Sequence, residues 1–132
     1  EFYLTSKERG GALSSFGEKT GHDGKYIEPK FFYKTVGMSL KDAVATFKLP
    51  YPNYIKIDVD GIEHLILEGA NSIILKASSI LIEINHNFDL QKSMCEKILL
   101  EKGFVLHNTE KVDLFNVSRN FENSYNQLWL RK

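Results

Sequence analysis

The residues best suited to chemistry follow one strand-like segment near the middle of the chain. Residues 54–59 are rich in strand-forming types and contain Asp58, and Asp60 and Gly61 follow directly. A carboxylate in the apolar end of a strand is costly to bury unless it is paired or used. Asp58 is therefore predicted to be functional. A carboxylate at this place suits general-base work or the binding of a cation.

A second group of polar residues ends the next strand-like segment, residues 79–85. Glu83 and Asn85 are two residues apart and share one face of a strand, and His86 follows them. Successive parallel strands are usually neighbours, so these side chains are expected to converge with Asp58 at one edge of the sheet. We predict catalytic roles for Asp58, Glu83 and His86, and a substrate contact for Asn85.

Asp60 and Glu63 admit two interpretations. Their spacing is typical of a capping box with Asp in the cap position, and helix capping is the favoured interpretation for both. Asp60 is also a candidate cofactor contact beside Asp58, and Glu63 is a candidate substrate contact. No pair of histidines has the spacing of metal ligands, so no metal site is predicted.

Strands and helices alternate along the sequence in an order that positions these residues. Strand patterns cover residues 1–4, 31–36, 54–59, 79–85, 104–107 and 127–131, and helical patterns cover 40–47, 62–73 and 90–99. Two apolar strands are each followed by a helix, which predicts an α/β fold of mostly parallel strands. The last two strands have no helix between them and are predicted to pair antiparallel. Residues 5–29 are glycine-rich without a pattern and are predicted to form a long flexible loop.

Composition narrows the class of protein. The length of 132 residues fits a single domain. Seventeen basic residues balance seventeen acidic ones, so the net charge does not favour binding to nucleic acid or to a membrane surface. The single cysteine, Cys95, excludes an internal disulfide and fits the cytoplasm. No apolar run approaches the roughly 20 residues that a membrane span needs.

Residues 58–61, Asp-Val-Asp-Gly, allow a rival enzyme class. They resemble the first motif of haloacid-dehalogenase-type phosphatases, in which the first Asp is a nucleophile and the second an acid/base. That motif normally opens the chain, and the later paired acids that would hold magnesium are absent here. A magnesium-dependent phosphatase using Asp58 and Asp60 is the first alternative, and a non-catalytic α/β module is the second.

The longer string from residue 54 to 85 resembles the FkbM-type methyltransferases. That family reads hydrophobic-Lys-Ile-Asp-Val-Glu-Gly-x-Glu, then an apolar helix ending Leu-x-Gly-Ala, then a strand ending Ile-Glu-Ile-His or Asn. The matching segments are residues 55–63, 67–70 and 82–85. Residues 34–36 and 39–42 are similar to the family's Val-x-Leu-Asp-Asp segment. An ordered string of this length makes the resemblance specific.

The resemblance implies S-adenosylmethionine-dependent O-methylation of a hydroxyl on a small molecule such as a sugar, a glycolipid or a polyketide-like compound. It also implies a Rossmann-like, seven-stranded class I sheet. Asp58 matches the family's acid beside the methionyl end of the cofactor and the acceptor. Asp60 stands where the family more often has Glu, and the shorter side chain reduces its reach to a ligand.

A methyltransferase of this fold seats its cofactor on a glycine-rich turn after the first strand and an acid after the second. Neither pattern occurs before residue 54, and the sequence starts at Glu1 in a strand-like segment. Residues 1–132 are therefore expected to form one partial domain that lacks the N-terminal cofactor-binding half. We expect it to bind S-adenosylmethionine weakly, which calorimetric titration would test. An exposed sheet edge would favour a homodimer or strand addition.

Overall fold

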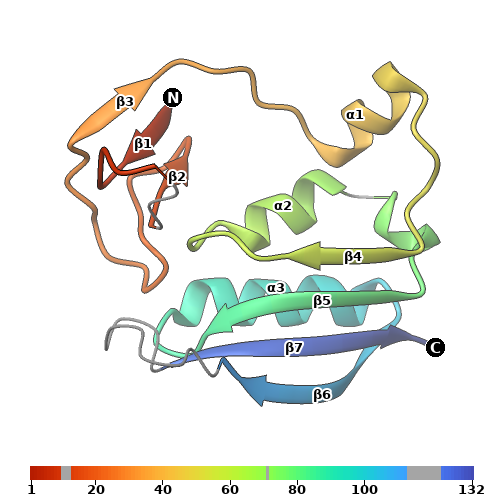
Figure 1. The fold of residues 1–132 in the computed structure, drawn as a ribbon. Helices are drawn as coiled ribbons and strands as arrows, with labels where there is room; N and C mark the ends of the chain where they lie inside the picture. The colour runs from red at the N-terminus through yellow and green to blue at the C-terminus, as the bar shows by residue number, and fades with distance from the viewer. Residues whose placement is uncertain (10–12, 71, 113–122) are drawn as a thin grey trace.

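The computed structural model describes residues 1–9, 13–70, 72–112 and 123–132, which form two β-sheets and three α-helices (Figure 1). The larger sheet has the order β4-β5-β7-β6, with β4 at Tyr54–Ile57, β5 at Ser79–Asn85, β6 at Phe104–Lys111 and β7 at Ser124–Arg131. The smaller has the order β2-β1-β3, with β1 at Phe2–Leu4, β2 at Ser15–Phe16 and β3 at Phe31–Tyr33. The helices are α1 at Leu40–Phe47, α2 at Glu63–Ala70 and α3 at Asp89–Glu101, with a 3₁₀ turn, η1, at Ile74–Lys76.

The larger sheet is mixed. β4 and β5 are parallel neighbours with Ile57 opposite Ile82, while β7 lies between β5 and β6 and pairs antiparallel with both. β4, β5 and β6 therefore run in one direction and β7 in the other. The predicted adjacency of the two apolar strands is confirmed, as is the antiparallel pairing of the last two strands. The chain is an α/β fold, as predicted.

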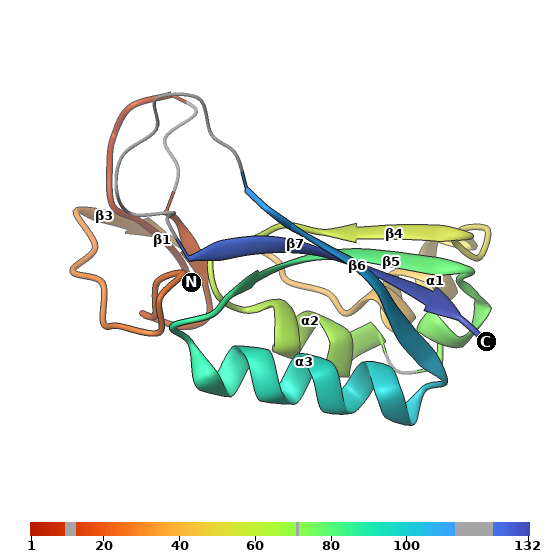
Figure 2. The ribbon, with the colours of Figure 1, turned by 90° about the horizontal axis from the view of Figure 1, so that it is seen from below.

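α2 and α3 cover one face of this sheet, and no helix in the described ranges covers the other (Figure 2). Ile80, Ile82 and Ile84 of β5 are buried in the core between the sheet and the helices, with Leu67 of α2 and Leu99 of α3. Because side chains alternate along a strand, Glu83 lies on the opposite, uncovered face. The helices thus bury one face of the sheet, and the side chains of β4 and β5 on the other face remain open to ligands.

The helices begin and end where the local sequence favours a helix start or stop. Ser39, a serine directly before a helical pattern, caps α1, and its hydroxyl accepts a hydrogen bond from the Asp42 amide at 3.1 Å. Lys48 ends α1 in a left-handed conformation, two residues before Pro50, which could not continue the helix comfortably. Cys95 of α3 lies in the core.

Several strand boundaries differ from the sequence prediction. β4 ends two residues earlier than predicted, β7 begins three residues earlier, and β6 extends four residues further. The short strand β2 lies inside residues 5–29, where no strand was predicted, because its two residues are too few for a periodic pattern. Residues 113–122, between the last two predicted strands, lie outside the described ranges. None of the described helices is long and apolar enough to cross a membrane.

Candidate functional site

Asp58 is the first residue after β4, at the carboxyl end of the strand. Lys56 lies two residues earlier and therefore on the same face, and its Nζ is 2.7 Å from Asp58 Oδ2. The Asp58 side chain is 46% exposed, so water screens this ion pair and it adds little to stability. The Asp58 carboxylate remains accessible to a ligand, and the ion pair with Lys56 of the preceding strand orients it.

Glu83 lies beside Asp58 on the uncovered face, since Ile82 of β5 is opposite Ile57 of β4. Burial raises the pKa of the Glu83 carboxyl above its usual range, and the negative charge of Asp58 raises it further. The two acids therefore interact, and Glu83 holds a proton to higher pH than an isolated glutamate. The predicted convergence of Asp58 and Glu83 is present in the structure.

Asp60 does not cap α2, so the capping interpretation is wrong for this residue. The helix begins at Glu63, and Asp60 Oδ2 instead accepts a hydrogen bond from the Ser14 amide at 3.0 Å. Burial raises the pKa of Asp60, while that hydrogen bond and the positive charge of His22 oppose the rise. Asp60 thus ties the turn after β4 to the N-terminal part of the chain.

Glu63 is 1% exposed and faces the protein interior. Its Oε1 accepts hydrogen bonds from the backbone amides of Val59 at 3.3 Å and Gly61 at 3.4 Å, and its Oε2 accepts one from Gln91. Burial raises the pKa of Glu63 to about 7 despite these bonds. The backward reach expected of a capping box is present, but the predicted substrate contact has no exposed carboxylate to make it.

Asn85 shares the uncovered face with Glu83 but is nearly fully buried. Its Oδ1 accepts a hydrogen bond from the Asn87 amide at 2.9 Å, which closes the turn between β5 and α3. The side chain therefore shapes this turn, and a direct substrate contact would compete with that bond.

His86 lies on the helix-covered face and away from Asp58. Its ring stacks on Tyr125 with centroids 4.0 Å apart, and it lines a pocket with Lys92 and Trp129. Burial lowers the pKa of its imidazole. His86 follows Ile82 and Ile84 in the strand alternation, and for that reason the structure does not bring it to the predicted acidic site.

The segment around His22 is a part of the site that sequence reasoning did not identify. Gly61 has φ +106°, and a Cβ there would lie 2.5 Å from the carbonyl oxygen of Gly21. The positive charge of His22 lowers the pKa of both Asp60 and Glu83, so its side chain lies near both acids. The only signal in the sequence was a histidine between two glycines in a segment without a pattern.

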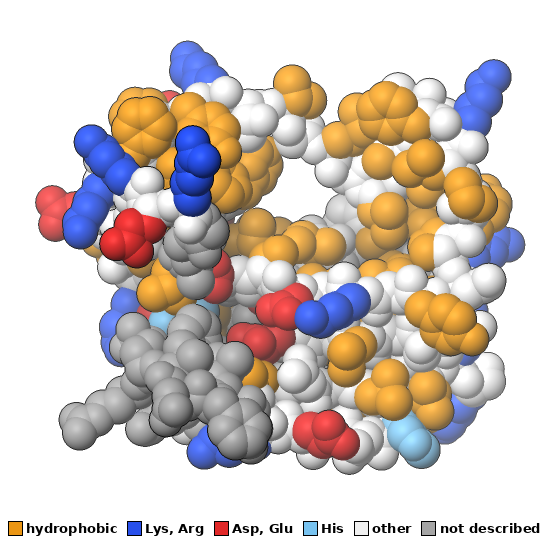
Figure 3. Space-filling model, in the orientation of Figure 1, with side chains coloured by type: hydrophobic (Ala, Val, Ile, Leu, Met, Phe, Trp, Pro, Cys, Tyr) orange, Lys and Arg blue, Asp and Glu red, His pale blue; other side chains and the backbone are white. Residues whose placement is uncertain are grey.

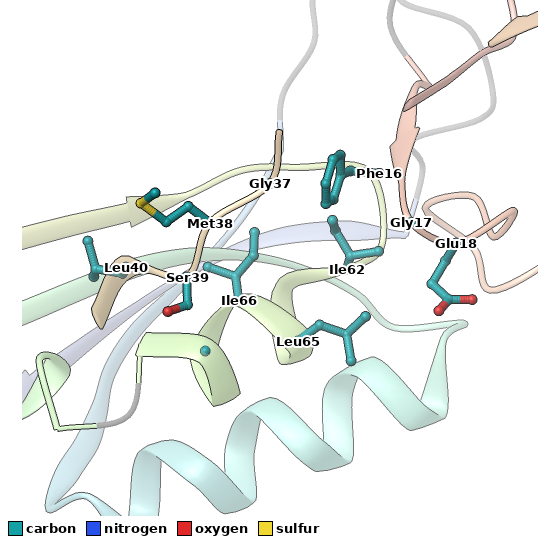
Figure 4. A pocket seen from close by; sticks show the side chains of 11 residues that line it. Phe16, Gly17, Glu18, Gly37, Met38, Ser39, Leu40, Ile62, Leu65 and Ile66 are labelled. Atoms are coloured by element: carbon teal, nitrogen blue, oxygen red, sulfur yellow. The ribbon is translucent and has the colours of Figure 1, made fainter. Parts of the chain in front are cut away.

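Asp58 lies on an apolar groove of about 520 Å³ together with Leu40, Ile55 and Ile66. Leu40 and Ile66 also line a neighbouring pocket of about 400 Å³, where Phe16 and Ile62 lie on the far side (Figure 4). Hydrophobic side chains gather around the hollow between the small sheet and α1 (Figure 3). Asp58 thus borders an apolar groove at the β4 edge of the sheet that a ligand could occupy.

The described residues contain no cluster of three or more His, Cys, Asp or Glu side chains that could hold a metal ion.

Acids gathered where two parallel strands end define an α/β domain with an enzyme-like site at the carboxyl edge of its sheet. Residues 2–106 match the family model of the methyltransferase FkbM domain, and the chain belongs to this family. The match confirms the resemblance found in the sequence, identifies a methyltransferase, and decides against the phosphatase alternative. No curated protein and no solved structure matches the chain.

Proposed function

We propose that this chain forms the acceptor side of an S-adenosylmethionine-dependent O-methyltransferase. The acceptor is a hydroxyl on a small molecule such as a sugar, a glycolipid or a polyketide-like compound, and the enzyme works in the cytoplasm. Its larger sheet belongs to a Rossmann-like sheet of class I type. The observation that carries the proposal is the accessible Asp58 carboxylate beside an apolar groove in a methyltransferase domain.

The acids of the site fit one end of S-adenosylmethionine. That cofactor is cationic at its sulfonium and α-ammonium groups and carries ribose hydroxyls, all of which suit carboxylate oxygens as partners. Asp58 and Asp60 are the residues that would hold it. When bound, the cofactor supplies an electrophilic methyl group. Asp60 also anchors the Ser14 segment, so it could organise the wall of the cofactor site as well as contact the cofactor.

Asp58 orients the acceptor by accepting a hydrogen bond from its hydroxyl group, which holds the oxygen in line for attack. The Asp58–Glu83 pair would take up the hydroxyl proton of the acceptor during transfer. The raised pKa of Glu83 makes this pair a better base than an isolated aspartate.

The other predicted residues have supporting roles in this proposal. We assign Glu63 and Asn85 to the two turns that carry the acids, since both side chains are buried in hydrogen bonds there. His86, on the opposite face of the sheet, has no role in the transfer.

The proposal is tested with the full-length protein and S-adenosylmethionine carrying a labelled methyl group, by following the label into hydroxylated small molecules from a cell extract. Asp58→Asn keeps the shape and removes the proton acceptor, and we expect kcat/KM to fall about 100-fold or more, as for the loss of a general base. Glu101→Gln is the matched control, a remote exposed carboxylate at the end of α3. Unchanged transfer by Asp58→Asn would contradict the role of Asp58.

A further inference from the structure

Gln91 is the polar member of an otherwise apolar stripe on α3. Gln91, Cys95 and Leu99 follow one another at intervals of four residues and are the buried residues of this helix, and Gln91 is 2% exposed. An amide in such a place destabilises the fold unless its donor and acceptor are both used. Its position in the core therefore indicates a specific purpose.

Both polar atoms of the Gln91 amide are used, and they connect different parts of the chain. Oε1 accepts a hydrogen bond from the Asn85 amide at 2.9 Å, in the segment that leaves β5. Nε2 donates to Oε2 of Glu63. The other oxygen of Glu63 accepts from the amides of Val59 and Gly61, in the turn that leaves β4. A continuous buried chain of hydrogen bonds thus joins the turns at the ends of the two parallel strands.

We propose that Gln91 is a positioning residue for methyl transfer, which holds the turn carrying Asp58 in register with the end of β5 that carries Glu83. The inference rests on the proposed function, because it concerns the geometry of the same acidic pair. Gln91 acts through Glu63 and the backbone at Asn85, and has no contact with the acceptor.

The bridge, by which we mean the hydrogen bonds from Glu63 through Gln91 to the Asn85 backbone, requires an amide side chain at position 91. The Asn85 N–H needs an acceptor and the Glu63 carboxylate needs a donor, and a glutamine side chain presents both at its end. Methionine has nearly the same shape but offers neither. Replacing the residues that orient metal ligands typically costs 10- to 100-fold in activity, and a misplacement of reacting groups by about 1 Å can cost about 100-fold; we expect an effect of this order at position 91.

The first test compares Gln91→Met with Leu99→Ala in the full-length protein. Leu99 lies in the same buried stripe, two turns further along α3, and its side chain has no polar group, so Leu99→Ala loosens the helix without removing a hydrogen bond of the bridge. We expect Gln91→Met to lower kcat by about 10-fold or more, with little change in KM for S-adenosylmethionine. Leu99→Ala should keep kcat near that of the wild type while lowering Tm at least as much.

Gln91→Glu adds a second measurement, the pH dependence of activity, which would not change if the role of Gln91 were merely structural. A second carboxyl beside Glu63 can restore the bridge only when the two share one proton. The titratable groups facing position 91 are Glu63 of α2 and Cys95 of α3, and burial raises the pKa of the Cys95 thiol so that it stays neutral. The activity of Gln91→Glu relative to the wild type should therefore be highest at low pH and fall as pH rises.

Hydrogen–deuterium exchange separates failure of this inference from failure of the proposed function. In Gln91→Met, backbone exchange should rise together in residues 58–61 and 85–88, and in Leu99→Ala it should not. The inference is overturned if Gln91→Met exchanges and turns over like the wild type, or if its kcat falls no more than that of Leu99→Ala. A wild-type protein that transfers no methyl group overturns the proposed function and the catalytic role with it, while exchange still decides whether the bridge exists.

Discussion

Glu63 carries a carboxylate that folding moves from water into the interior between α2 and α3. Three hydrogen-bond donors face its two oxygens, yet burial outweighs them and the pKa rises from 4.5 to about 7. The charged form is therefore disfavoured in the folded protein relative to the unfolded chain. Near neutral pH the residue is close to half-ionised, so its titration affects stability in this pH range.

The raised pKa sets the direction of a pH effect on stability. Because the folded state binds this proton more tightly than the unfolded state, the stabilisation is fully present below pH 4.5 and is lost as pH rises through about 7. A shift of this size corresponds to about 3 kcal/mol. We expect the unfolding free energy of the wild type to fall between pH 5 and pH 8 by up to that amount relative to Glu63→Gln. Denaturant unfolding measures the difference, and Glu101→Gln, at an exposed site, should follow the wild type.

At the scale of single residues, the sequence predicted the site positions that depend only on strand order and on the alternation of side chains along a strand. Asp58 and Glu83 could be placed together because both lie at the ends of successive strands, and register brings them side by side. His86 was misplaced because one step along a strand reverses the face. Gln91 and His22 could not be found, since Glu63 is 28 residues from Gln91, the acids near His22 are also distant in sequence, and only packing brings these groups together.

At the scale of elements, the turn after β4 depends on how closely the segment of residues 21–24 approaches it. Gly61 has φ +106°, and a Cβ at this position would meet the backbone of Gly21 and His22. Gly24 makes a similar approach, because a Cβ there would meet the ring of Phe88 just before α3. Two glycines thus let a loop segment lie directly on the turns that carry the acids.

Gly61→Ala should separate this segment from the turn. It adds backbone strain of about 1–3 kcal/mol at the positive φ, and it also adds a clash with backbone atoms that cannot move aside cheaply. Gly103→Ala is the matched control, with φ +82° but nothing within 4 Å of the added Cβ. We expect both variants to lose stability in thermal unfolding, Gly61→Ala more so. Only Gly61→Ala should lose methyl transfer, and equal losses in both would contradict the packing argument.

Periodic elements were predictable from sequence because each has a pattern several residues long. β5 was placed with both ends correct, and α1 with its cap, since an apolar run and a serine before a helical pattern are local signals. β2 and the extension of β6 were missed. Both depend on pairing with distant strands, Phe2 with Phe16 in one case and Lys111 with Tyr125 in the other, which no local pattern encodes.

At the scale of the whole molecule, the two edges of the larger sheet differ. Among the described strands, β4 forms one edge and β6 the other. The β4 edge borders the apolar groove of Leu40, Ile55 and Ile66, and Tyr54 is 77% exposed beside it. The exposed part of β6 runs from Leu106 to Lys111 and is polar apart from Leu106. Unpaired backbone groups next to an apolar surface favour the addition of another strand.

We therefore expect the 132-residue chain to form a homodimer through β4 rather than β6. Tyr54→Lys places a charge on the proposed edge, where two copies would repel each other, and should weaken the dimer about tenfold or more, a change of about 1.4 kcal/mol in association free energy. Leu106→Lys makes the matched change on β6, where Leu106 is 48% exposed, and should leave association unchanged. Sedimentation velocity over a dilution series measures both dissociation constants. A chain that stays monomeric at the highest concentration would contradict the dimer, and equal weakening by the two variants would contradict the assignment to β4.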